Sequence, residues 1–168
     1  MKEKKISEYD LVMGMHCIQE LIRFYPKKIW KVYVQDSIQK NSQKKTLLRQ
    51  LQESNIPVEI CRKSVLEKLV SSTSHQGFVA CIKKRTFQQG DKFLARQKEE
   101  KRSFVLLLDQ IHDPHNIGAI FRSAECFGVD GVIFSEKNGP SITPSVSKVS
   151  SGASEHLPLI RIANLALY

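Results

Sequence analysis

At 168 residues the chain is long enough for one full domain or two small ones, and 41% hydrophobic with 26% charged residues is an ordinary composition for a globular protein. No apolar run approaches the roughly 18 residues that span a bilayer, and the charged N-terminal stretch is unlike a signal peptide. The four cysteines lie far apart without CxxC spacing, which argues against a disulfide framework or a zinc site and predicts buried or free thiols in a cytoplasmic protein.

The net charge of +9 is unevenly distributed along the chain. Residues 1–102 hold 22 Lys and Arg against 11 Asp and Glu, a net of +11, whereas residues 103–168 hold 4 against 6, a net of −2. A basic block of this kind attracts polyanions at long range, and the usual polyanion is nucleic acid. A lysine-rich surface that only contacts solvent is the alternative.

The first part of the chain alternates predicted helices and strands. The helical spacing of Ile18, Leu21, Ile22 and Tyr25 predicts a helix that ends at Pro26. Further helices are predicted over residues 43–55 and 64–72, and strands over residues 31–35, 56–61 and 76–84. This alternation predicts a small α/β domain over residues 1–84.

A second unit is predicted after a linker. Residues 85–103 are rich in charge and glutamine, which predicts a linker with about one helical turn. Residues 104–109, FVLLLD, are almost all apolar, as expected for a strand buried on both faces of a parallel sheet. A helix over residues 116–127 that stops at Gly128, followed by a strand over residues 131–134, completes a βαβ unit. Open α/β sheets bind ligands at the edge where the loop before this helix would lie.

The predicted helix over residues 116–127 carries a lone arginine, Arg122, among small residues on the face opposite its apolar stripe. Its guanidinium is therefore expected to be open to a ligand. Asn116 at the start of the helix can cap backbone N–H groups or hold the loop. A solvated surface arginine is the alternative. His112 and His115 lack a third ligand at metal-binding spacing, so no metal site is expected.

Four stretches of the sequence resemble a known family. The stretch "LLLDQIHDPHNIGAIFRSAECFGVDGVIF" (106–134) closely resembles the first signature of the SpoU family of RNA ribose 2′-O-methyltransferases, in the SPOUT superfamily. The stretch "SVSKVSSGASEHLPLIRIANL" (145–165) resembles the start of the second signature. In the first part, "GMHCIQELI" (14–22) and "SHQGFVACI" (74–82) resemble the substrate-binding domain of the members that methylate a guanosine in large-subunit ribosomal RNA. The resemblance covers nearly the whole chain.

The resemblance implies a fold, a chemistry and the residues that serve it. The fold is α/β, with a small N-terminal RNA substrate-binding domain (1–84) and the first part of a parallel-sheet, knotted methyltransferase domain (104–168), usually in a homodimer. The methyl donor is S-adenosylmethionine and the substrate is ribosomal RNA. The resemblance assigns catalysis to Arg122, supported by Asn116 and Glu155. It places five residues in the RNA-binding part: Gly14, His16, His75, Gln76 and Gly77.

The expected reaction leaves two roles open for Arg122. A ribose 2′-hydroxyl must lose its proton as it attacks the methyl group, whereas a free arginine keeps its own proton far above neutral pH. Either a desolvated guanidinium gives up a proton, or a cation stabilises the developing alkoxide. The sequence favours neither account.

The chain departs from the family pattern after the second signature. The third signature and the cofactor-binding loops are expected beyond Tyr168, so no cofactor-binding residue is assigned. We therefore expect little or no activity from the 168-residue chain, and doubtful dimerisation. We also expect the strand over residues 104–109 to leave an exposed apolar edge. The alternative function is that of a non-catalytic RNA-binding remnant of such an enzyme.

Overall fold

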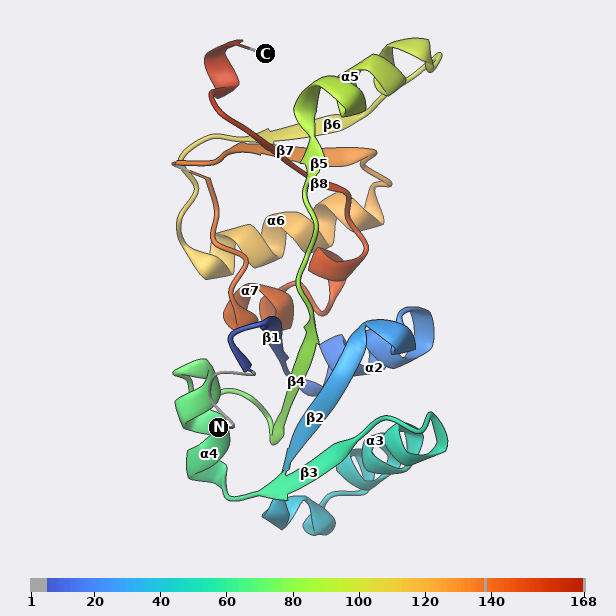
Figure 1. Ribbon diagram of the computed structural model, residues 1–168, viewed down its shortest axis with the longest axis vertical. Helices are drawn as coiled ribbons and strands as arrows, with labels where there is room; N and C mark the ends of the chain where they lie inside the picture. Colours follow the sequence, from blue (N-terminus) through green and yellow to red (C-terminus); the bar gives the residue numbers. More distant parts are fainter. Residues whose placement is uncertain (1–5, 138, 168) are drawn as a thin grey trace.

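The computed structural model describes residues 6–137 and 139–167, which form two α/β halves arranged end to end along the long axis (Figure 1). Strand β4 of the first half runs directly towards β5 of the second half, so the two sheets are linked by a few residues. In this described part of the chain, no helix has the length and apolar character that a bilayer crossing requires.

The N-terminal half is a four-stranded sheet covered by helices on both faces. The strand order is β1-β4-β2-β3, with β4 antiparallel to both neighbours and β3 parallel to β2. The elements are β1 (Tyr9–Met13), α2 (Met15–Phe24), η1 (Pro26–Lys28), β2 (Ile29–Gln35), η2 (Asp36–Lys40), α3 (Ser42–Glu53), β3 (Val58–Cys61), α4 (Lys63–Val70) and β4 (Phe78–Lys83). The predicted helices and strands of this half are confirmed to within a few residues, and β1 is an additional strand that the sequence pattern did not predict.

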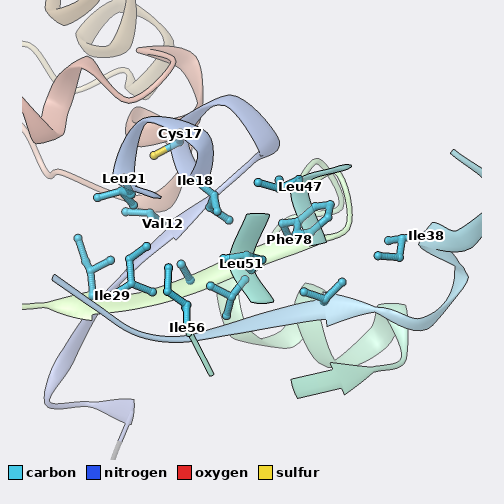
Figure 2. Packing of buried hydrophobic residues seen from close by; sticks show 14 residues of the cluster. Val12, Cys17, Ile18, Leu21, Ile29, Ile38, Leu47, Leu51, Ile56 and Phe78 are labelled. Carbon is cyan, nitrogen blue, oxygen red and sulfur yellow. The ribbon is translucent and has the colours of Figure 1, made fainter. Parts of the chain in front are cut away.

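Alternation along β4 explains why helices cover both faces of this sheet. Phe78, Ala80 and Ile82 belong to the cluster that packs against α2 and α3, which Figure 2 shows from close by. Val79 and Cys81 point the other way, into a second cluster that contains Leu66 of α4. Burial on both faces is the reason that this strand is a continuous apolar run.

The C-terminal half is a parallel sheet with the order β5-β8-β7-β6. Alternate residues of its central strand β7 face two separate clusters: Val132 and Phe134 pack with helices α6 and α7, whereas Ile133 packs with α5. The elements are β5 (Gln88–Gln89), α5 (Gly90–Glu99), β6 (Val105–Leu108), α6 (Pro114–Cys126), β7 (Gly131–Ser135), α7 (Pro144–Val149), η3 (Ala153–Glu155), β8 (Leu159–Ile162) and η4 (Leu165–Leu167).

The prediction that residues 104–109 form a strand buried on both faces is wrong in one respect. Strand β6 lies at the edge of the sheet, and Leu107 is 53% exposed. The face that carries Leu106 and Leu108 is covered by α6, but α5 packs beside β8 and leaves Leu107 open on the other face. The expected exposed apolar edge is present, with Phe104 also half exposed.

The prediction of a linker over residues 85–103 also needs correction. This segment contains β5, which pairs with β8, and the ten-residue helix α5. Phe93 anchors this helix because its ring is buried beside Ile133 and Ile160. The abundance of charge and glutamine reflects the solvent-facing side of an amphipathic helix, a composition that a flexible linker shares.

Candidate functional site

The loop between β6 and α6 is organised by Asp113. Its carboxylate caps α6, with Oδ1 accepting from the His115 N–H at 3.1 Å and Oδ2 accepting from the Asn116 N–H at 3.3 Å. Pro114 occupies the first helical position, where its missing N–H costs nothing. Asn116 was expected as a possible cap, but Asp113 takes this role and the Asn116 side chain is exposed in the first turn.

Arg122 is exposed on α6, one helical turn after the buried Gly118. Gly118 lies where α6 crosses α7: a Cβ at this position would be 2.6 Å from Val149 Cβ and 3.1 Å from the Ser150 backbone nitrogen. The close crossing holds the face of α6 that carries Arg122 next to α7 and η3, the segments of the second predicted signature.

This crossing predicts that Gly118→Ala destabilises the fold. Alanine gains about 1 kcal/mol in helix propensity, but its methyl group meets the Cβ of Val149, which cannot rotate away. Overpacking of this kind typically costs about 1–3 kcal/mol. Urea unfolding should show a lower free energy of unfolding for Gly118→Ala than for wild type. Ser123→Ala, on the exposed side of the same helix, is the control and should not be destabilised. Equal stability of both variants would mean that the two helices can separate without cost.

Glu155 is buried and does not pair with Arg122. Its Oε1 accepts from Arg85 Nη2 at 2.6 Å and Nε at 3.2 Å, and from the Ser154 hydroxyl at 3.0 Å. Arg85 also reaches the N-terminal half, where Asp10 Oδ2 accepts from its Nη1 at 3.2 Å and from its backbone N–H at 2.9 Å. Arg85 and Glu155 side chains are only 9% and 1% exposed. The structure therefore couples the predicted catalytic glutamate to the junction between the halves.

Arg85 is the residue of this site that sequence reasoning missed. It follows two lysines at the end of β4, and the run Lys83–Lys84–Arg85 resembles any solvated basic stretch. A local signal does exist, because Arg85 lies two residues after the end of the apolar strand β4 and two residues before Phe87, whose ring packs against Phe134. Nothing local, however, identifies its partners Asp10 and Glu155, which are 75 and 70 residues away.

Four of the five predicted RNA-binding residues come together where the turn before β4 (His75, Gln76 and Gly77) meets Gly14 at the start of α2. The Gln76 side chain accepts from the Met15 N–H at 3.0 Å, and His75 Nδ1 accepts from the Gly77 N–H at 3.0 Å. Gly14 and Gly77 have φ angles of 95° and 90°, which favour glycine at both positions. His16 is exposed on the first turn of α2. Their contact with RNA stays a prediction.

Within this turn, His75 has a structural role. The ring is 1% exposed, and its Nε2 has no hydrogen-bond partner within the described residues. Burial lowers the pKa of His75, because the protonated ring would lose its hydration. Protonation at Nδ1 would also remove the acceptor for the Gly77 N–H.

The lowered pKa of His75 predicts a pH dependence of stability. The unfolded chain takes up the proton near the ordinary value of 6.5 while the folded chain does not, so protonation favours unfolding. Stability is therefore complete above pH 6.5 and falls as the pH drops towards the lowered pKa of the folded state, by at most about 1.4 kcal/mol per pH unit. Urea unfolding at pH 7.5 and 5.5 should give a smaller difference for His75→Asn than for wild type. The neighbouring Ser74→Ala variant, whose difference should match wild type, is the control.

The hollow beside α6 does not fit S-adenosylmethionine. This hollow, of about 310 Å³, is lined by Phe104, Ile120, Phe127 and other side chains without charge. It offers one hydroxyl, that of Ser123, and no charged partner for the cofactor's ammonium, carboxylate and sulfonium groups. The described residues also contain no cluster of three or more His, Cys, Asp or Glu side chains that could hold a metal ion.

Solved structures define the class of this fold. The chain superposes on the SpoU methyltransferase AviRb from Streptomyces viridochromogenes, solved in complex with AdoMet, with a TM-score of 0.69 at 19% identity, covering 98% of this chain and 58% of that chain. It superposes on an rRNA methyltransferase from Sinorhizobium meliloti with a TM-score of 0.64 at 16% identity, covering 99% of this chain and 59% of that chain. At such low identity the likeness shows the fold alone, which is that of a SpoU methyltransferase.

Sequence comparisons then identify the family. The model for "RNA 2'-O ribose methyltransferase substrate binding" matches residues 11–88, and that for "SpoU rRNA Methylase family" matches residues 103–168. A protein of Staphylococcus aureus strain MSSA476 assigned to the TrmH family of tRNA/rRNA methyltransferases is 40% identical over 161 residues, 95% of this chain and 63% of that protein. One from Staphylococcus haemolyticus strain JCSC1435 is 36% identical over 157 residues, which are 93% of this chain and 62% of that protein. The chain belongs to the SpoU methyltransferase family, and it spans less than two thirds of the length of these relatives.

Proposed function

We propose that the chain serves S-adenosylmethionine-dependent 2′-O-methylation of RNA, with a guanosine of large-subunit ribosomal RNA as the substrate. The observation that carries this proposal is the pairing of two family domains in one chain, with Arg122 exposed on the helix of the first signature. We also propose a cytoplasmic location. A homodimer is usual for the family, but we expect weak dimerisation of the 168-residue chain.

In this proposal Arg122 acts on the ribose hydroxyl. A cation held beside the 2′-oxygen stabilises the negative charge that develops there as the proton leaves. Small neighbours on α6, such as Ala119, leave room for the nucleotide to approach the guanidinium. Glu155 acts indirectly, because its carboxylate is bound by Arg85 and by Ser154 within the buried network. Asn116 and the capped loop before it shape the approach to Arg122.

We further propose that the 168-residue chain alone has little or no transferase activity. The hollow beside α6 does not fit the cofactor, and the relatives are longer by more than a third of their length. The alternative function, a non-catalytic RNA-binding protein, is favoured by one observation: Glu155 is engaged by Arg85 and not by Arg122.

Isothermal titration of S-adenosylmethionine into the 168-residue chain tests the proposal first. No detectable heat, together with salt-dependent binding of ribosomal RNA, is the expected result. Cofactor binding at micromolar strength or tighter would overturn the proposed inactivity, and transfer of labelled methyl groups to the rRNA should then be measured directly. A chain that binds neither RNA nor cofactor would contradict both functions.

A further inference from the structure

Two adjoining hollows lie at the junction between the two halves. Figure 1 shows the place where β4 leaves the N-terminal sheet, and the hollows lie near it. One hollow of about 420 Å³ is lined by the end of α2, the end of β4 and the segment from η3 to β8. A second hollow of about 420 Å³ adjoins it and shares Tyr25, Lys28 and Lys83 with it. We call the two together the junction groove; its lining includes Phe24, Tyr25, Lys28, Lys83, Lys84 and His156.

The junction groove carries an uncompensated positive charge. Lys27, Lys28, Lys83 and Lys84 line it, and no ion pair of these lysines is found in the part of the chain that the structure describes. The Lys28 ammonium instead lies 4.0 Å from the centre of the Tyr25 ring. The lysines come from two segments far apart in the sequence, so the fold concentrates charge that the sequence disperses.

The one carboxylate among the lining residues of the junction groove, Glu155, is already engaged. Glu155 lines the groove and is bound by Arg85 at 2.6 Å, so its charge is compensated by that arginine. Glu20, whose Oε2 lies 3.4 Å from His156 Nε2, is not among the residues that line the groove. An anionic polymer in the groove would meet cations from both segments, and such an arrangement favours a phosphate backbone.

Aromatic rings lie among these lysines. Phe24 is 49% exposed, and the edge of its ring meets the His156 ring at a centroid distance of 5.1 Å. The Tyr25 hydroxyl lies 3.4 Å from His156 Nδ1, which fixes the orientation of both rings. An exposed ring that is held in place offers a stacking surface to an unpaired base, whereas the bases of a duplex are already stacked on each other.

We propose that the junction groove binds a single-stranded segment of RNA, with phosphates on the lysines and a base stacked on Phe24. This inference rests on the proposed function in taking RNA as the polymer, and it adds a contact surface at the opposite end of α2 from the turn of Gly14, Gln76 and Gly77. A strand in this groove touches both halves and passes beside the Arg85–Glu155 pair, since both residues line it.

Fluorescence anisotropy with a labelled single-stranded RNA of about 12 nucleotides tests this proposal on the full chain without cofactor. The triple variant Lys28→Gln, Lys83→Gln, Lys84→Gln should bind at least roughly ten-fold more weakly, and its salt-dependence slope should fall by about 2 because three phosphate contacts are lost. The matched control replaces the exposed Lys45, Lys68 and Lys98, on α3, α4 and α5, by Gln, and it should bind almost as wild type does.

Stacking is tested separately from charge. Phe24→Leu keeps an apolar side chain but removes the ring, and it should weaken binding of the single strand by roughly ten-fold. Phe127→Leu, at an exposed ring that follows the last residue of α6 and lies outside the groove, is the control and should have no effect. A 12-base-pair duplex, of about the same length, should bind more weakly than the single strand and be insensitive to Phe24→Leu.

Equal losses in the two lysine triples would overturn the proposal, since binding would then depend on total charge alone. So would a Phe24→Leu variant that binds both RNAs as wild type does. If circular dichroism shows that the groove triple does not fold, the RNA affinities of two single variants are compared instead. Lys84→Gln, at an exposed lysine of the groove, should then bind more weakly than Lys45→Gln. Because cofactor is absent, failure of methyl transfer with intact groove binding would contradict only the proposed activity.

Discussion

Replacing Arg85 by methionine is expected to destabilise the folded chain by about 3–5 kcal/mol. The variant leaves the Glu155 carboxylate buried without its cation, and an uncompensated buried charge typically lowers the free energy of unfolding by this amount. Urea unfolding measures the loss. The same change at Arg49, whose pair with Glu53 is mostly exposed, should cost less than about 1 kcal/mol.

A double variant separates the charge from the packing in this network. Arg85→Met combined with Glu155→Gln removes both charges and should recover much of the stability lost in Arg85→Met alone. If the double variant is no more stable than Arg85→Met, the loss comes from the arginine's contacts with Asp10 and Ser147. That outcome would contradict the interpretation of Arg85 as the counter-ion that keeps Glu155 buried.

Arg122→Ala is expected to lower the rate of methyl transfer by about 10² to 10³, the usual effect of removing one group that stabilises a developing oxyanion. Because the 168-residue chain is proposed to be inactive, the assay uses a fusion to the part of the Staphylococcus aureus relative that follows the aligned segment. Transfer of labelled methyl groups to unmodified large-subunit rRNA is measured. RNA affinity should stay within about two-fold of the unsubstituted fusion, since only the charge developing in the reaction is affected.

Two further variants sharpen this experiment. Arg122→Lys keeps a positive charge, so partial activity supports electrostatic stabilisation, whereas activity as low as in Arg122→Ala supports proton transfer through the guanidinium. Arg96→Ala, at an exposed arginine on α5, controls for the loss of one positive charge. A loss in Arg122→Ala no larger than in Arg96→Ala would mean that Arg122 has no part in catalysis.

Most helices and strands follow from local patterns, and the structure confirms those of the N-terminal half to within a few residues. The exceptions share one cause. Strand β1 is five residues long, and its pairing with β4 joins positions as far apart as Tyr9 and Lys83. Helix α5 is charged on its outer side, and only the burial of Phe93 against the sheet distinguishes it from a linker. Both depend on contacts that a local window does not contain.

For the site, the sequence by itself determined which residue types are available: an arginine among small residues on a helix, a glutamate in the second signature, and the two glycines Gly14 and Gly77. Only the tertiary structure decided their partners. Glu155 binds Arg85 and not Arg122, the charge of four lysines gathers in the junction groove, and β6 lies at an edge. The physical reason is that periodicity and capping act over a few residues, whereas ion pairing and edge exposure depend on how distant segments pack.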